Sequence, residues 1–469
     1  MPTAFLGLAA AFVVALGCAA LANAVLGWRP RSLPDWNEAF LAGLGIATAA
    51  VIPLSLLRRP GTAFALLAAL LVVMLLRRSD FARALAAAPG AFRTKPPVAA
   101  ALAVAGLALF AWSNGCAGFG WDGFQIWMTK AQEFYATGEL ALDVPTPGYM
   151  TRIVSYPPAV PLAEALVASF WRAFPFAAVK GIFTVFALSL VVGTFRLVET
   201  LTDRRTAYVA AGLASLLPGL TMRTAVLGNA DMPLAAVGAA AAAAALRGAG
   251  HPPDWRKPAP WLLGTLAMVK SEGTVLLAIG AVAMTLAAAA AHRPTGARRI
   301  LVFAAPLAFF VFARFAQRTL IPAEYLEFSP ITSFRFSLLA TRGPIIAARM
   351  GRWLLSLPSW GILWPAFLAG VVVVAMRAPR SGALAIAATA LCVVLADAGM
   401  FLFTRWGDVR LHFDQAYPRL LAQVAPLAVA TVAAAVFPLV RDDHGRRGKP
   451  AAAPRGRRSG ASVRGGTIP

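Results

Sequence analysis

Residues 4–26, AFLGLAAAFVVALGCAALANAVL, form an apolar stretch that contains no charged side chain. A helix rises ~1.5 Å per residue, so this stretch is about 34 Å long as a helix and crosses a hydrocarbon core of ~30 Å. No basic region precedes it, and no small-residue cleavage site followed by a soluble domain comes after it. We therefore expect a retained membrane helix and not a signal peptide that is removed.

The rest of the chain has the same character. Of its 469 residues, 59% are hydrophobic and 13% are charged, a balance far from that of soluble domains. The composition predicts an all-α polytopic membrane protein with one membrane domain at 1–440. A basic tail at 441–469, rich in Gly, Ala and Pro, is expected to be disordered and cytoplasmic. Cys18, Cys116 and Cys392 are too scattered to indicate a disulfide framework or a metal site.

The net charge of +23 is expected to report topology and contact with anionic lipid, with no nucleic-acid partner. Placing the basic clusters in the cytoplasm gives about thirteen spans, with the N-terminus outside and the C-terminus inside. The predicted spans are 4–26, 37–57, 61–76, 97–113, 176–198, 206–220, 230–246, 258–270, 272–291, 300–316, 361–376, 382–404 and 420–440.

Two features fit this topology poorly. Arg58 and Arg59 fall on the outer side, and residues 258–270 rise only ~20 Å as a helix, too little to cross unaided. If those residues form one long bent helix with the next span, Lys270 is buried within it and every later loop changes side.

The polar segments with chemically interesting residues all fall on the outer side of this topology. These segments are 114–175, 221–231, 270–272, 317–360 and 405–419. Such clustering predicts a reaction at the outer membrane surface.

Residues 121–140, WDGFQIWMTKAQEFYATGEL, show helical amphipathicity. Their apolar face predicts a helix that lies in the plane of the membrane interface, with its aromatic rings in the headgroup layer. Asp122 and Gln125 match a capping box, and Gly138 matches a C-terminal stop. Asp122 is therefore either a helix N-cap or a carboxylate that performs chemistry, and the residue types leave both interpretations open.

Three further motifs follow along the chain. At 155–162, SYPPAVPL starts an apolar segment to about Phe174 that we expect to be an interfacial or re-entrant helix. Asp231 begins an Ala-rich span, where it either caps the helix or has a function. Lys270 and Glu272 lie between two apolar segments. Ionisable groups there require a partner or a charged ligand, so Lys270 either binds a lipid phosphate or makes an internal salt bridge.

Taken in order, four motifs resemble the GT-C superfamily of multi-spanning glycosyltransferases. They are WDxxxIWxxKA at 121–131, YPPxxPL at 156–162, ADxPLA at 230–235 and KxEG at 270–273. The nearest branch contains bacterial proteins related to protein mannosyltransferases and lipid A aminoarabinose transferases. The motif-bearing core covers about 97–291, and residues 405–426 are similar to the family's last outer loop.

The resemblance implies transfer of a sugar from a polyprenyl-phosphate carrier to an acceptor hydroxyl, with inversion, at the outer face of the bacterial cytoplasmic membrane. It implies that Asp122 acts as the base and that Lys270 and Arg419 contact the carrier phosphate, roles that suit proton removal and stabilisation of a departing phosphate. The full set of expected substrate-binding residues is Lys130, Tyr156, Asp231, Lys270, Glu272, His412 and Arg419.

One position departs from the family's pattern. Many relatives have a second acidic residue directly after the first-loop aspartate, and Gly123 stands there in this chain. The chain therefore lacks the acidic pair that would bind a metal, so we assign no metal ligand and no cofactor, and a divalent metal stays an open alternative without support from a motif. Expected partners are the lipid-linked donor, a glycan, lipid or protein acceptor, and membrane lipids.

Two alternatives remain open. The spans also fit a transporter or a lipid flippase, although such proteins commonly have paired halves around a midplane site, and this sequence has no convincing internal repeat. Asp397, near the outer end of its span, fits either a transport pathway or an active-site wall. A noncatalytic assembly subunit that keeps the same scaffold is the other alternative.

Overall fold

The computed structural model describes residues 2–28, 30–55, 61–79, 82, 98–138, 156–221, 227–248, 254–290, 297–319, 335–379 and 381–439. These residues form helices joined by turns, and no β-strand occurs among them. The all-α prediction is therefore confirmed for this part of the chain. Contacts divide the chain into Met1–Leu439 and Val440–Pro469; the predicted basic tail, Arg58 and Arg59 lie outside the described residues.

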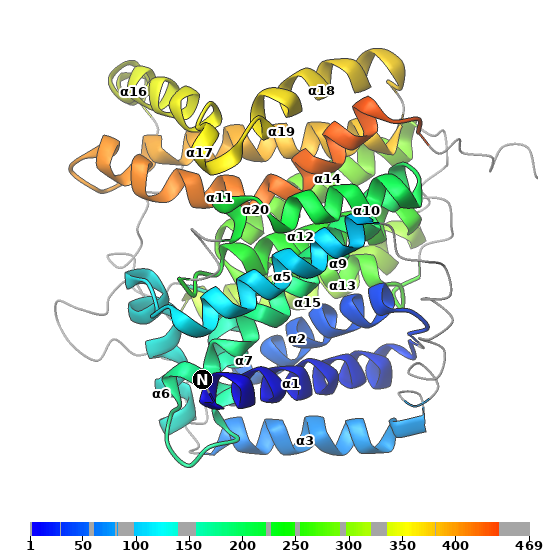
Figure 1. Ribbon diagram of the computed structural model, residues 1–469, viewed down its shortest axis with the longest axis vertical. Coiled ribbons are helices and arrows are strands. Elements are labelled where there is room, and N and C mark those ends of the chain that lie inside the picture. The colour runs from blue at the N-terminus through cyan, green and yellow to red at the C-terminus, as the bar shows by residue number, and fades with distance from the viewer. Residues whose placement is uncertain are drawn as a thin grey trace, which may run out of the picture. The chain divides into compact units, whose positions relative to one another are not determined.

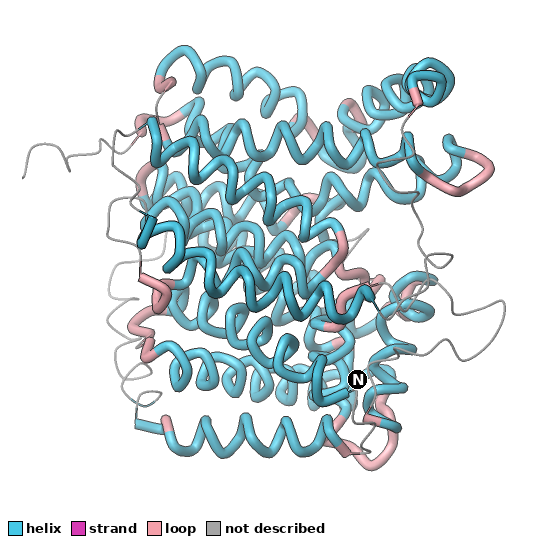
Figure 2. Tube along the Cα trace, turned by 180° about the vertical axis from the view of Figure 1, so that it is seen from behind, coloured by secondary structure: helices cyan, strands magenta, loops and turns pink. Residues whose placement is uncertain are grey.

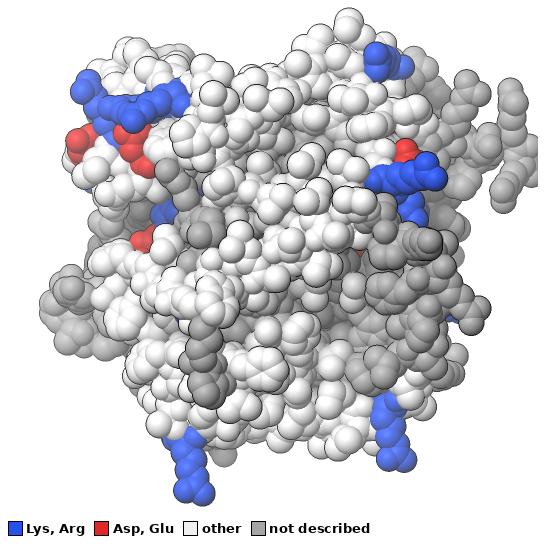
Figure 3. All heavy atoms as spheres, viewed as in Figure 1, with Lys and Arg blue, Asp and Glu red and all other residues white. Residues whose placement is uncertain are grey.

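Five helices of the described part are long and apolar enough to cross a membrane: Thr3–Leu26, Val98–Cys116, Phe176–Leu201, Gly382–Phe403 and Val409–Val436. In Figure 3, the charged side chains visible on this face stand mostly toward the two ends of the helices, and the described surface between them is largely uncharged. A protein with an uncharged band between two charged ends fits a bilayer. The chain is an all-α membrane protein.

Each of the predicted spans coincides with a helix. The helices are α1 (Pro2–Leu26), α2 (Leu33–Ser55), α3 (Thr62–Leu76), α5 (Val98–Cys116), α9 (Gly181–Leu201), α10 (Arg204–Ser215), α12 (Asp231–Gly248), α13 (Pro258–Val269), α14 (Glu272–Ala290), α15 (Ala297–Thr319), α18 (Leu363–Arg377), α19 (Gly382–Met400) and α20 (Val409–Val436). Several are short: α10 has 12 residues, which is about 18 Å of helix. The positions of the helices are thus predicted better than the number of crossings.

Small residues let the helices run side by side at close range, as Figures 1 and 2 show from opposite sides. A Cβ atom on Gly43 of α2 would lie 1.8 Å from the carbonyl oxygen of Cys18 in α1. On α9, a Cβ atom of Gly193 would lie 3.2 Å from the Cβ atom of Ala239 in α12. Close approach through glycine and alanine is how membrane helices gain van der Waals contact, since lipid supplies no hydrophobic drive between them.

The chain reverses direction between α13 and α14. Lys270 is extended, with φ −153° and ψ 156°, and a Cβ atom on Gly273 would lie 1.9 Å from the carbonyl oxygen of Leu266. About two helical turns further on, a Cβ atom on Gly280 would lie 3.5 Å from Cδ2 of Leu263. The two helices therefore pack antiparallel. The alternative of one long bent helix is wrong, and Lys270 is buried at a turn.

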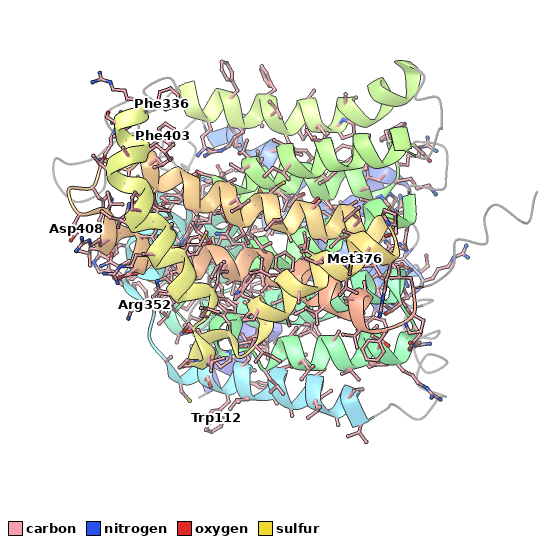
Figure 4. The ribbon with its side chains drawn as sticks, turned by 90° about the horizontal axis from the view of Figure 1, so that it is seen from above. Trp112, Phe336, Arg352, Met376, Phe403 and Asp408 are labelled. Atoms are coloured by element: carbon pink, nitrogen blue, oxygen red, sulfur yellow. The ribbon has the colours of Figure 1, made fainter. Side chains whose placement is uncertain are left out.

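Further helices, most of them short, accompany one end of the long ones. They are η1 (Gly123–Met128), α6 (Thr129–Thr137), α7 (Ala159–Ala168), α8 (Phe176–Val179), α11 (Pro218–Leu220), α16 (Phe336–Leu354), α17 (Leu357–Trp360) and η5 (Phe401–Phe403). Figure 4 shows α16 running from Phe336 to Arg352 across the direction of the long helices. Several of the polar segments between the long helices are therefore helical themselves, and they lie at this end of the protein.

The helix at 121–140 differs from its predicted placement. It is a π-helix, η1, continued by α6, and its apolar face packs into the protein instead of the headgroup layer: Trp127, Met128 and Phe134 are buried. The buried face packs against α7, which gains more contact than lipid headgroups offer. Gly138 ends α6 as predicted, with φ 77° and its N–H donating to the carbonyl oxygen of Phe134.

Two further predictions need correction. Every residue of α7 is buried and the helix ends at Ala168, so the apolar helix is internal and the interfacial alternative is wrong. Residues 169–174 are not helical. Helix α20 begins at Val409, because the Asp408 carboxylate accepts hydrogen bonds from the N–H groups of Arg410 (2.8 Å) and Leu411 (3.2 Å). Most of the predicted loop at 405–419 is therefore helical.

Candidate functional site

One pocket gathers the polar residues of several distant segments. It measures about 460 Å³ with its open mouth included. Its walls come from the η1 segment, the start of α12, the turn between α13 and α14, the α19–η5 junction and the N-terminal half of α20. The lining residues are Asp122, Ile126, Trp127, Tyr156, Asp231, Lys270, Glu272, Met400, Phe401, His412, Ala416, Arg419 and Leu420. Every predicted site residue except Lys130 is among them.

Asp122 lines the pocket as a partner of Arg419, not as a helix cap. Its backbone is already helical, with φ −64° and ψ −40°, and its side chain makes no capping hydrogen bond, so the predicted capping box is wrong. Nη1 of Arg419 donates to Oδ2 of Asp122. Both side chains keep 25% of their surface exposed, which leaves the ion pair open to the pocket.

Two contacts hold the segment that carries Asp122. Lys180, the residue before α9, donates from Nζ to the carbonyl oxygens of Ala117 (2.6 Å) and Gly118 (3.2 Å), which directly follow the end of α5. The N–H of Gly120 donates to the carbonyl oxygen of Leu227 at 2.9 Å. The loop before η1 is thereby held against the loop before α12, and Asp122 comes to the same pocket as Asp231.

The same packing explains the glycine after Asp122. A Cβ atom on Gly123 would lie 2.0 Å from the carbonyl oxygen of Leu227, closer than any real Cβ contact. A second acidic side chain at this position would push the two loops apart. The packing of this chain thus requires glycine at the position where many GT-C proteins have a second acidic residue.

A buried charge network forms the floor of the pocket. Nζ of Lys270 lies 2.8 Å from Oδ1 of Asp231 and 2.8 Å from Oε1 of Glu272. The amide of Gln423 on α20 also donates to Oδ1 of Asp231, at 2.7 Å. Asp231 is 1% exposed and Lys270 is 6% exposed, so each charge depends on the other for its stability. Of the two interpretations of Lys270, the structure contains the internal salt bridge.

Helix α20 presents one face to the site. His412, Ala416, Arg419 and Leu420 line the pocket, and Gln423 follows one turn below; these positions recur at the spacing of a single helix face. Nδ1 of His412 lies 2.6 Å from the hydroxyl of Thr404, and its ring stacks on Trp406 with 4.3 Å between centroids.

Lys130 lies behind the wall of the pocket, not in it. It is completely buried, and its Nζ donates to the carbonyl oxygen of Tyr156 at 2.8 Å. Burial lowers the pKa of Lys130 to about 7, and the positive charge of Arg314 adds to the lowering. This geometry indicates that Lys130 positions Tyr156, whose ring packs edge-on against Trp127 at 5.1 Å.

Several contributors were missed by sequence reasoning. Gln423 would have been found by continuing the helical spacing from Arg419, had α20 been predicted to begin at its Asp408 cap. Arg314, which donates to the hydroxyl of Ser271 at 3.1 Å, carried no motif signal. Asp397, which the sequence offered as a transport-pathway residue or an active-site wall, was not missed: it is 2% exposed and does not line the pocket.

The arrangement combines carboxylates and cations in one partly enclosed space. A carboxylate at the open side suits removal of a proton from a hydroxyl, and fixed cations suit stabilisation of a developing anion. Among the described residues, no group of three or more His, Cys, Asp or Glu side chains is placed to hold a metal ion.

Comparisons with protein-family models, with curated proteins and with solved structures found no significant match to this chain. Its class is therefore defined by fold and site alone. It is an all-α membrane protein with a charged pocket at one end of its helices.

Proposed function

We propose that this protein is a glycosyltransferase of the GT-C type that transfers a sugar from a polyprenyl-phosphate carrier to an acceptor hydroxyl. The acceptor is a glycan, a lipid or a protein. In this proposal the chain has about thirteen spans in the cytoplasmic membrane, by the positive-inside rule, and the pocket faces the outside.

The convergence of the motifs carries the proposal. Asp122, Asp231, Lys270 and Arg419 are spread over about 300 residues of sequence, yet all line one pocket. Structural capping alone does not require distant polar residues to meet, whereas a site for a charged substrate does. Asp122 and Asp231 in particular are engaged by side chains of other helices.

Each residue has a role in a single displacement. Asp122 accepts the proton of the acceptor hydroxyl as its oxygen attacks the anomeric carbon, and the bond from that carbon to the phosphate oxygen breaks. Arg419 and Lys270 neutralise the charge of the departing polyprenyl phosphate. Attack from the face opposite the phosphate inverts the anomeric centre. Trp127, Tyr156 and Phe401 supply apolar and aromatic walls around the sugar.

The test is the fate of the carrier-linked sugar in cells that lack the gene. Mass spectrometry of lipid extracts from a deletion strain should show a polyprenyl-phosphate sugar that accumulates, and the wild-type gene should remove it. A gene with Asp122→Asn should leave it in place because the base is missing.

Asp414→Asn is the matched control. Asp414, in the N-terminal half of α20, also forms an ion pair with an arginine: its Oδ2 lies 2.8 Å from Nη1 of Arg349 in α16, with similar exposure of both side chains. Asp414 does not line the pocket. This variant should restore wild-type lipids. A deletion strain with unchanged carrier-linked sugars, or full rescue by Asp122→Asn, contradicts the proposal. Uptake of a solute or lipid by proteoliposomes without sugar transfer would favour the transporter alternative.

A further inference from the structure

The two cations of the pocket differ in how firmly they are held. Lys270 is bound by two carboxylates, of which Asp231 is 1% and Glu272 is 13% exposed at the side chain. Among the described residues, Arg419 makes one ion pair, from Nη1 to Asp122, and both of these side chains are 25% exposed; the buried charge of Asp231 acts on Arg419 without a direct contact. An ion pair open to water contributes little to stability, while breaking a buried pair is strongly destabilising. The pair of Asp122 and Arg419 is therefore the one that an incoming anion can separate.

Arg419 also has an unused donor. Its Nε is buried and has no hydrogen-bond partner in the described part of the protein. A buried donor without an acceptor is unfavourable, and a phosphate oxygen beside the guanidinium would satisfy it. Arginine binds phosphate best through two N–H groups at once, and Asp122 already occupies Nη1.

The oxygen that holds Arg419 belongs to the carboxylate that the reaction needs. While Oδ2 of Asp122 accepts the guanidinium N–H, that oxygen is not available to accept a proton from an acceptor hydroxyl. A phosphate and Asp122 thus compete for the same guanidinium.

We infer that binding of the donor's phosphate to Arg419 displaces the Asp122 carboxylate and so makes the base available only when a donor is in place. The inference rests on the proposed function, and it adds an order of events: donor first, acceptor second. Arg419 is then a positioning residue for the base as well as a ligand of the phosphate. No additional group is required, because the ion pair is exchanged for another ion pair.

Binding of the carrier itself tests the exchange. A radiolabelled polyprenyl phosphate is titrated against the purified full-length protein in detergent, with folding of each variant checked by its thermal unfolding. Asp122→Asn should bind the phosphate about threefold to tenfold more tightly than wild type, since the competitor for Arg419 is gone. Asp122→Ala should strengthen binding as well, and Asp414→Asn should leave the affinity unchanged.

A double-mutant cycle separates exchange from simple charge repulsion. In the Arg419→Gln background, Asp122→Asn should change the affinity by less than about twofold, because Asp122 and the phosphate no longer compete for a guanidinium group. If Asp122→Asn strengthens binding equally in both backgrounds, repulsion explains the effect and the inference is overturned. Equal affinities of wild type and Asp122→Asn overturn it too. Failure of the wild-type protein to bind polyprenyl phosphate overturns the proposed function and the inference together.

Discussion

Replacing Lys270 with methionine is expected to lower the free energy of unfolding by about 3–5 kcal/mol. Methionine keeps most of the apolar stem, so the change removes mainly the charge. The Nζ atom of Lys270 lies 2.8 Å from carboxylate oxygens of both Asp231 and Glu272, and all three side chains are at most 13% exposed. Without the ammonium group, two carboxylates remain buried side by side.

The magnitude follows from the contacts that are lost. A hydrogen bond to a charged group contributes about 1.5–3 kcal/mol, so two of them amount to about 3–6 kcal/mol. Gln423 still donates to Asp231 at 2.7 Å, and the partial exposure of Glu272 lets water reach it. Both effects reduce the loss to the range given.

Reversible unfolding in mixed detergent micelles, titrated with SDS and followed by tryptophan fluorescence, measures this loss. Lys257→Met is the matched control, because Lys257 is the exposed N-cap of the same helix, α13, at its other end; it should change stability by less than about 0.5 kcal/mol. Adding Asp231→Asn to Lys270→Met should restore part of the stability. A loss below about 1 kcal/mol for Lys270→Met, or an equal loss for Lys257→Met, would refute the buried network as described.

Three other positions around the pocket are open to the same kind of test. Gly123→Ala should cost about 1–3 kcal/mol of stability, because its Cβ atom would meet a carbonyl oxygen at 2.0 Å. Lys130 has a folded-state pKa of about 7 against 10.5 for the free side chain, so the unfolded chain binds more protons between these values; stability should rise from pH 7 to pH 10.5, and Lys130→Met should flatten the rise. Gln423→Leu should cost about 2 kcal/mol, because a buried carboxylate loses a donor at 2.7 Å.

Each of these predictions has its own control. Gly118→Ala should be tolerated, since nothing lies within 4 Å of its added Cβ atom; equal losses for Gly118→Ala and Gly123→Ala would contradict the packing argument. A rise with pH that persists in Lys130→Met would assign it to another group. Wild-type stability of Gln423→Leu would show that the hydrogen bond to Asp231 contributes nothing.

The helices were predictable because each signal is local. A long apolar run such as 4–26 must bury its backbone hydrogen bonds in any membrane, and only a helix does so within one segment. Gly138 ends α6 as predicted, because glycine adopts the left-handed conformation of a helix C-cap whatever surrounds the helix. The Asp408 cap of α20 was equally local and was overlooked, which is why the predicted loop at 405–419 was wrong.

What surrounds each helix was not predictable in this way. By composition, the aromatic face of the predicted helix at 121–140 could pack against lipid headgroups or against another helix. In the structure it packs against α7. Asp122 satisfied the pattern of a cap, but Arg419 on a distant helix offers its carboxylate a full charge instead of a partial one. Pair energies of this kind depend on distances that residue spacing does not contain.

The sequence by itself determined that this is an all-α membrane protein, where its helices lie and which polar residues stand at their ends, because hydrophobicity and helix periodicity act over a few turns. Only the tertiary structure decided that Asp122 faces Arg419, that Lys270 is shared by Asp231 and Glu272, and that Lys130 stays behind the wall. The physical reason is that burial of a charge is tolerable only beside its partner, and partners are chosen by how helices pack.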